Sequence, residues 1–175
     1  MGDYQHIHHN FDPVFDSRSH VLVLGSFPSV LSRQNSFYYG NPRNRFWQVI
    51  AACTHSPVPP NFPEVESIAA KERLLLENGI ALWDVIESCD IKGSADSSIK
   101  NVAPSHIERI TDAASIQLII ANGRTAYNLY NRYIKPRIYR DAVCLPSTSP
   151  ANAAYTLERL VQHWGPVLQS ELPLE

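Results

Sequence analysis

The chain alternates short apolar runs with longer amphipathic segments. The apolar runs are bounded by turn-forming residues and have the length of buried strands, at 21–24, 80–85, 116–121 and 142–145. The segments that separate or follow them carry apolar residues at helical spacing, at 45–52, 65–77, after Gly123 and at 155–168. Strands that alternate with helices favour a parallel sheet covered on both faces. We therefore predict an α/β fold with three α/β/α layers around a short, mainly parallel four-stranded central sheet.

The length and loop content of the chain indicate one domain. A domain of 175 residues buries roughly 70% of the surface that its unfolded chain exposes. The 13 prolines gather in loops, and neither repeats nor low-complexity tracts divide the chain. We expect a single domain over 1–175, with residues 1–15 as a peripheral arm packed on it. This arm contains His6, His8 and His9, for which a metal site is the less favoured interpretation.

Composition limits the location and the partners of the protein. No window approaches the ~18 uninterrupted apolar residues of a membrane span, and the N-terminus lacks an apolar signal core, so we expect a cytoplasmic protein without membrane contact. An odd number of cysteines argues against a disulfide framework. With a net charge of −2, nucleic-acid binding requires a local basic patch, and such a patch is formed by Arg33, Arg43 and Arg45.

Loops rich in small polar residues follow all of the predicted strands. In open parallel sheets, ligands bind beyond the carboxyl ends of the strands. The loops at 25–29, 84–90, 122–125 and 146–152 should therefore meet at one edge and form one site. This site would offer amides, hydroxyls, aromatic rings and a single strand-end carboxylate, Asp84. Such groups can read a flat heterocycle and hold a water molecule.

Several common chemistries lack their sequence signatures. The chain has no GxxxxGK[ST] phosphate loop and no GxGxxG dinucleotide motif. Ser26 does not lie in a GxSxG nucleophile elbow, and no Cys/His cluster has zinc spacing. We expect neither a metal nor another cofactor.

An ordered set of motifs resembles a known enzyme family. VLVLGSFPS (21–29) is followed by YYGNPRNRFW (38–47), LIIANGRTAY (118–127) and LPSTSPANA (145–153). Together these resemble the uracil-DNA glycosylase superfamily, and more narrowly its hypoxanthine (deoxyinosine) DNA glycosylase branch, over roughly residues 11–168. The resemblance implies a monofunctional enzyme that hydrolyses the N-glycosidic bond of a flipped deaminated base and leaves an abasic site. Its partner would be DNA that contains such a base, with no obligate protein partner.

Two positions depart from the pattern of the uracil enzymes. Phe27 or its neighbours fill the place where most relatives carry an Asp or Asn that activates or orients water. Leu145 replaces the histidine before the Pro-Ser loop. Both departures disfavour strong uracil release. A uracil or mismatch-specific glycosylase is one alternative, and a catalytically idle DNA- or nucleotide-binding module of the same fold is another.

The resemblance assigns candidate residues to three tasks. Asn41, Asn44 and Ser26 are the candidates for catalysis; Asn41 ranks first for holding the attacking water, because Asn44 precedes a predicted helix and has an alternative role as its cap. Phe27 would stack on the flipped base, with core packing as its alternative role. Asp84 and Tyr39 would bind the base edge, with a helix-cap or turn aspartate as the alternative role of Asp84. The candidates for DNA contact are Arg43, Arg45, Ser147, Ser149, Pro150 and Asn152.

Overall fold

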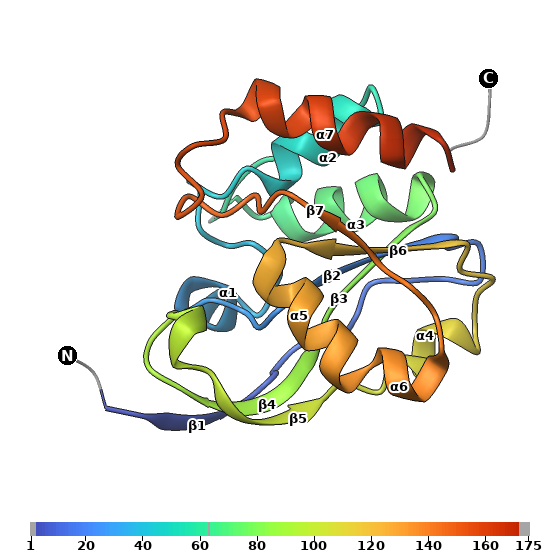
Figure 1. The fold of residues 1–175 in the computed structure, drawn as a ribbon. Helices are drawn as coiled ribbons and strands as arrows, with labels where there is room; N and C mark the ends of the chain where they lie inside the picture. The colour runs from blue at the N-terminus through green and yellow to red at the C-terminus, as the bar shows by residue number, and fades with distance from the viewer. Residues whose placement is uncertain (1–2, 63, 172–175) are drawn as a thin grey trace.

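The computed structural model describes residues 3–62 and 64–171 (Figure 1). Its central sheet contains four parallel strands in the order β3-β2-β6-β7. Their bounds are Val21–Gly25 (β2), Ile80–Asp84 (β3), Leu118–Asn122 (β6) and Val143–Leu145 (β7). Every residue of β2 and β3 is buried, as expected for strands that are covered on both faces. The predicted parallel sheet is confirmed, with strand ends within two residues of the predicted ones.

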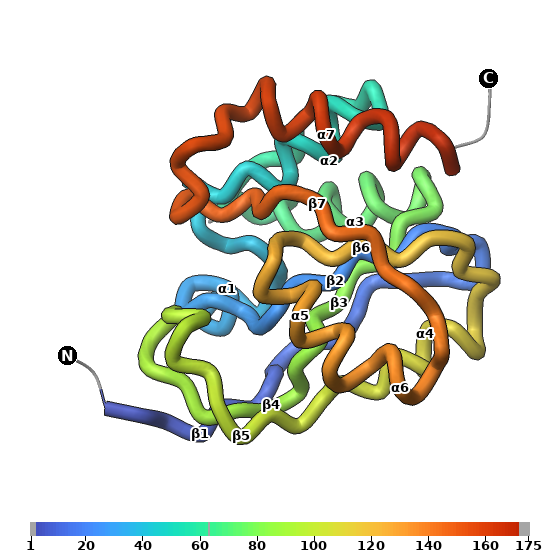
Figure 2. Tube along the Cα trace, viewed as in Figure 1, coloured from blue at the N-terminus to red at the C-terminus, as the bar shows by residue number. Residues whose placement is uncertain are grey.

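Helices cover both faces of this sheet (Figure 1). On one face lie α2 (Phe46–Cys53), α3 (Ser67–Glu77) and α7 (Leu157–Gln169), and α2 packs along α7. On the other face α5 (Arg124–Tyr133) packs on β6 and β7. The tube in Figure 2 shows the same two helical layers around the sheet. The predicted α/β fold with helices on both faces is therefore confirmed.

Three short helices and one 3-10 turn complete the helical elements of the described residues. They are α1 (Val30–Asn35), α4 (Glu108–Thr111), α6 (Lys135–Ile138) and η1 (Asp96–Ser98). Of these, α1 follows the carboxyl end of β2 directly, where the predicted site lies. None of the helices within residues 3–62 and 64–171 has the length and apolar character that a membrane span requires.

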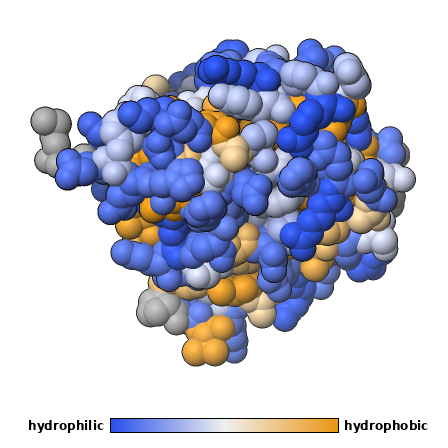
Figure 3. Space-filling model, turned by 90° about the horizontal axis from the view of Figure 1, so that it is seen from below, coloured by the Kyte–Doolittle hydropathy of each residue, from blue (hydrophilic) through white to orange (hydrophobic). Residues whose placement is uncertain are grey.

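A second sheet, which the sequence pattern did not predict, lies beside the first. It is antiparallel, has the strand order β1-β4-β5, and consists of Gln5–His8 (β1), Ile86–Ile91 (β4) and Lys100–Pro104 (β5). The predicted loop 84–90 is thus mostly strand, and residues 5–8 of the expected peripheral arm form an edge strand. Figure 3 views the molecule from the side of this sheet, where the surface is mainly hydrophilic with separate hydrophobic patches.

The second sheet escaped prediction for a physical reason. β1 is largely exposed and has the sequence QHIH, with one apolar residue. In β4 the pairing with β5 shifts register between Ile86 and Ser88 and again between Ser88 and Asp90. Such irregularities break the alternation of apolar and polar residues by which a half-buried strand is recognised in a sequence.

Candidate active site

A cavity of about 480 Å³ opens at the carboxyl ends of β2, β3 and β6. Each predicted loop contributes to its wall: residues 25–29, Asp84, Asn122 and residues 147–151. The first residues of α1 (30–32), the turn 94–96 between β4 and β5, and the segment around Tyr38–Asn44 complete the lining. Of the predicted loops 84–90 and 122–125, only the first residue of each lines the cavity.

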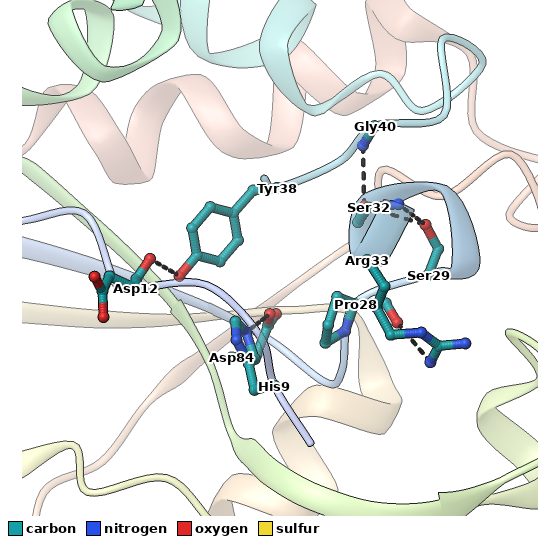
Figure 4. A network of polar contacts seen from close by, with 9 residues as sticks. All are labelled: His9, Asp12, Pro28, Ser29, Ser32, Arg33, Tyr38, Gly40 and Asp84. Atoms are coloured by element: carbon teal, nitrogen blue, oxygen red, sulfur yellow. Dashed lines mark hydrogen bonds and ion pairs between the residues drawn. The ribbon is translucent and has the colours of Figure 1, made fainter. Parts of the chain in front are cut away.

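The loop after β2 is fixed by hydroxyl groups (Figure 4). The Ser29 Oγ caps α1 by accepting the Ser32 backbone N–H at 3.2 Å. The Ser32 Oγ in turn accepts the backbone N–H of Gly40 at 3.0 Å, although Ser32 is buried. These bonds fasten α1 to the segment that carries Tyr39 and Asn41.

Gly25 permits a close approach between two strand ends. A Cβ at this position would collide with the Asp84 carboxylate and would lie 3.0 Å from the Tyr39 hydroxyl. Only glycine fits this contact without a shift of its neighbours. The carboxylate and the phenol therefore meet above Gly25, on the wall of the cavity.

Tyr39 is held as a neutral phenol. Its ring stacks on Phe46 with centroids 4.2 Å apart, and its hydroxyl accepts a hydrogen bond from the Asn122 Nδ2 at 3.1 Å. Burial, and then the charge of Asp84, raise the pKa of Tyr39 far above its ordinary value. Its O–H thus remains a hydrogen-bond donor at the position predicted for base contact.

Asp84 forms a buried pair with His9, which we did not predict (Figure 4). The His9 Nε2 lies 2.8 Å from the Asp84 Oδ2, and the two side chains are 4% and 5% exposed. No local sequence pattern could reveal this contact, because the two residues lie 75 positions apart. The candidate base-reading carboxylate therefore has a protein partner.

Asn44 belongs to a network of side-chain amides and hydroxyls. Its Oδ1 accepts the backbone N–H of Phe46 at 2.9 Å and the hydroxyl of Thr148 at 2.9 Å. Asn122 donates to the same Thr148 hydroxyl at 3.0 Å and accepts the Thr148 backbone N–H at 3.1 Å. Asn44 therefore supports the start of α2, but from the position before the N-cap, because the N-cap of this helix is Arg45 and not Asn44 as its alternative role stated. Thr148, which joins the two amides, was missed.

Asn41 is less committed to the fold. The residue is partly exposed and lines the cavity. Its Oδ1 accepts the backbone N–H of Arg43 at 3.0 Å, while its NH₂ group donates to no other described residue. Asn41 can therefore offer N–H donors to a ligand or a water, and its role in holding the attacking water stays a prediction.

Ser26 faces a second carboxylate. Its Oγ donates to the Asp96 Oδ1 at 3.1 Å, from the first loop to the turn between β4 and β5. Burial raises the pKa of Asp96 above its ordinary value, and the negative charge of Asp84 raises it further. The hydrogen bond from Ser26 acts in the opposite direction and lowers this pKa. Asp96 is the first residue of η1, in the connection between two strands of the unpredicted sheet, and was missed as a site residue for that reason.

Phe27 lies at the border between the cavity and a hydrophobic cluster. It lines the cavity but is only 8% exposed, and it packs with Ile86, Cys89 and Ile91. The Arg33 guanidinium lies 5.7 Å from the centroid of its ring. Phe27 therefore fills a core position, as its alternative role stated, while it also presents surface to the cavity.

Arg45 is engaged by carbonyl groups of the 147–155 segment. Its guanidinium donates to the Ser149 oxygen at 2.8 Å, to the Thr148 and Asn152 oxygens at 3.3 Å each, and also to the Tyr155 oxygen. The predicted phosphate contact would require this group to face solvent. Arg45 instead holds the segment in place, whereas Arg43 is exposed and its DNA contact stays a prediction.

The 147–152 loop is also braced from within. The Asn152 Nδ2 donates to the Ser147 oxygen at 3.0 Å. The Ser147 and Ser149 hydroxyls accept backbone N–H groups of Ser149 and Ala151, each at 3.2 Å. Pro150 lies on the cavity wall beside them. Four of the predicted DNA-contacting residues thus lie together in one hydrogen-bonded loop: Ser147, Ser149, Pro150 and Asn152.

Metal ligands are not clustered in the part of the chain that the structure describes. Within residues 3–62 and 64–171, no group of three or more His, Cys, Asp and Glu side chains is arranged to hold a metal ion. His6 and His9 are each paired with an aspartate, Asp90 and Asp84, respectively.

Comparison with known proteins places the chain in a family. The family model of the uracil DNA glycosylase superfamily matches residues 13–166. A relative named hypoxanthine DNA glycosylase from Methanosarcina acetivorans is 32% identical over 156 residues, which cover 87% of this chain and 93% of the relative. A relative of the same name from Methanosarcina barkeri is 30% identical over 145 residues, which cover 81% and 86% of the two chains.

A solved structure agrees with this assignment. The solution NMR structure of a Methanosarcina acetivorans protein named as a uracil DNA glycosylase aligns with a TM-score of 0.74 and 30% identity, and the match covers 91% of this chain and 95% of the other. The matched region includes the cavity and its loops. The resemblance seen in the sequence motifs is confirmed, and the chain belongs to the uracil DNA glycosylase superfamily.

Proposed function

We propose that this protein is a DNA glycosylase that removes hypoxanthine from a flipped deoxyinosine and leaves an abasic site. The observation that carries the proposal is the buried Asp84 carboxylate on the cavity wall, with its Oδ1 above Gly25. An ionised carboxylate only accepts hydrogen bonds. Hypoxanthine presents an N1–H donor at the edge where adenine presents a bare acceptor, so Asp84 favours the deaminated base.

The other cavity residues suit the remaining steps. The surface of Phe27 and the phenol of Tyr39 would bound the flipped base, whose extraction costs less when it is weakly paired. Asn41 would hold the attacking water. Hydrolysis breaks the bond between C1′ and the base nitrogen and forms a bond from C1′ to the water oxygen. Asp96, oriented by Ser26, would accept the proton that the water loses and pass it to solvent, and the departing base would take up one proton from solvent in return.

The DNA strand would rest on the neighbouring loops. Arg43 would contact a phosphate, and the Ser147 and Ser149 region would lie along the backbone of the damaged strand. The position of the departed base would be filled by the 147–152 loop, whose internal hydrogen bonds already fix its shape. An ordered loop loses less conformational entropy when it enters the duplex.

Base release from defined duplexes tests this function. Duplexes with a single deoxyinosine, deoxyuridine or deoxyxanthosine are incubated with the protein, and abasic sites are then cleaved with alkali. We expect cleavage at deoxyinosine to be the fastest. Cleavage at deoxyuridine alone would replace the proposal with a uracil glycosylase, and binding without cleavage of any duplex would indicate an idle module.

A further inference from the structure

His9 reaches Asp84, a residue of the cavity wall, from a part of the chain that the proposed function does not use. The backbone N–H of His9 donates to the Glu87 oxygen at 2.6 Å, directly after β1 pairs with β4. Since β4 begins two residues after Asp84, the pairing of β1 with β4 fixes the position of His9 relative to the Asp84 carboxylate. The second sheet therefore delivers a histidine to the end of a strand in the first sheet.

The ring of His9 is packed as tightly as a core residue. Its centroid lies 4.4 Å from that of Phe11 and 6.0 Å from that of Tyr38. Tyr38 is itself fixed, because its hydroxyl donates to the Asp12 backbone oxygen at 2.8 Å (Figure 4). The ring can therefore turn little, and its Nε2 stays directed at the Asp84 Oδ2.

The hydrogen-bonding partners of the ring identify its tautomer. The His9 Nδ1 is buried and has no hydrogen-bond partner among the described residues. A proton on Nδ1 would bury an unpaired donor, which costs more than an unpaired ring acceptor beside aromatic side chains. The single proton belongs on Nε2, which then donates to the Asp84 Oδ2.

This bond divides the tasks of the two carboxylate oxygens. The Oδ2 is occupied by the His9 N–H, whereas the Oδ1 lies above Gly25 near the Tyr39 hydroxyl and has no protein donor among the described residues. Without a donor on Oδ2, the carboxylate would lose the hydrogen bond that fixes its orientation, and Oδ1 could turn away from the cavity.

We propose that His9 is a positioning residue that holds the Asp84 carboxylate in a fixed orientation, with one oxygen free to accept the N1–H of hypoxanthine. The inference rests on the proposed function and extends it, because it assigns the discrimination against adenine to a pair of residues. Its basis is the buried hydrogen bond between His9 and a carboxylate of the cavity wall, together with the His9 Nδ1, which has no partner among the described residues and so leaves Nε2 as the donor.

Two substitutions separate the hydrogen bond from the packing. His9→Phe keeps an aromatic ring against Phe11 and Tyr38 but removes the donor, whereas His9→Gln keeps a donor near the Nε2 position and removes the ring. We expect His9→Phe to slow single-turnover hypoxanthine release by about 10- to 100-fold, as is typical when a supporting hydrogen bond to a functional group is lost. Its ratio of hypoxanthine to adenine release should fall as well, and His9→Gln should restore both.

A matched control and a double-mutant cycle complete the test. His6→Gln alters the exposed His6–Asp90 pair on the same segment and should change neither quantity. In an Asp84→Asn background, His9→Phe should cause no further loss, because its effect acts through Asp84. Normal hypoxanthine release by His9→Phe together with slow release by His9→Gln would overturn the inference. Losses of release rate that add up in the His9→Phe/Asp84→Asn double variant would overturn it as well. A wild-type protein that releases no hypoxanthine would overturn the proposed function and this inference with it.

Discussion

The side-chain oxygen of Asn44 accepts a hydrogen bond from the Thr148 hydroxyl at 2.9 Å, across 104 positions of the chain. The same oxygen accepts the backbone N–H of Phe46, the first residue of α2. Asn44 therefore joins the start of a helix to the 147–152 loop. Because both residues line the cavity, this hydrogen bond helps to fix the shape of the cavity wall. We therefore expect Asn44 and Asn41 to respond differently to substitution.

Asn44→Ala should reduce stability first. The substitution removes the acceptor for the Phe46 N–H and leaves the buried Thr148 with one partner fewer. We expect the free energy of unfolding in urea to fall by about 1 kcal/mol or somewhat more. Thr148→Val, which removes the hydroxyl from the other side, serves as the matched variant. Urea unfolding midpoints that are unchanged in both variants would show that the Asn44–Thr148 hydrogen bond does not contribute to stability.

Asn41→Ala should impair the chemical step instead. If Asn41 holds the attacking water, its loss should slow single-turnover base release by two to three powers of ten, or about 2.7–4 kcal/mol. The affinity for the damaged duplex and the melting temperature should change little, because the amide acts mainly in the transition state. An active Asn41→Ala beside a stable but inactive Asn44→Ala would reverse the two assignments.

The central sheet and the edge at which the site lies were both predictable from the sequence. The strands of the central sheet were predictable because burial on both faces leaves uninterrupted apolar runs such as Val21–Gly25. The loops after them were predictable as a site because parallel strands end at one edge. Both inferences depend on local patterns and one general property of the fold.

Contacts between distant segments could not be predicted in this way. His9 meets Asp84 only because a polar edge strand pairs with a bulged one, and neither strand carries a clear periodic signal. Arg45 looked like part of a basic patch, but its guanidinium is directed inward by carbonyl groups more than 100 positions away. A charged residue in a polar loop has the same sequence signature in both roles.

The two arginines should therefore respond differently to substitution. Arg43→Ala should make the slope of log affinity against log salt shallower by about one unit, since each phosphate contact adds about −0.9 for B-DNA. Arg45→Ala should instead lower stability, because several carbonyl groups of the 147–155 segment lose their donor. Salt titrations of DNA binding and urea unfolding of both variants check this. An unchanged salt slope for Arg43→Ala would show that Arg43 does not contact a DNA phosphate.

We expect the burial of Lys71 to make the stability of the protein depend on pH. It is buried in α3 between Trp47 and Phe62, and burial lowers its pKa to about 8 from an ordinary value of 10.5. Between these two values the unfolded chain binds more protons than the folded one, so stability should rise with pH across this window, by at most about 3 kcal/mol.

Lys71→Met isolates this effect. The variant keeps most of the side-chain volume and lacks the titrating group. Its free energy of unfolding should therefore gain less than that of the wild type between about pH 7 and about pH 10. Comparison of the two proteins cancels the contribution of buried tyrosines, which titrate in both. Equal gains in both proteins would mean that Lys71 titrates normally in the fold.

The most direct test of the proposed function is detection of the free base. A duplex with a single deoxyinosine is incubated with excess protein and a chelator, and the released base is identified by mass spectrometry. We predict stoichiometric free hypoxanthine and an abasic strand, and no protein–DNA adduct upon addition of borohydride. Deoxyinosine that remains intact in the presence of folded, DNA-binding protein, or release that stops with the chelator, would contradict a metal-independent hypoxanthine DNA glycosylase.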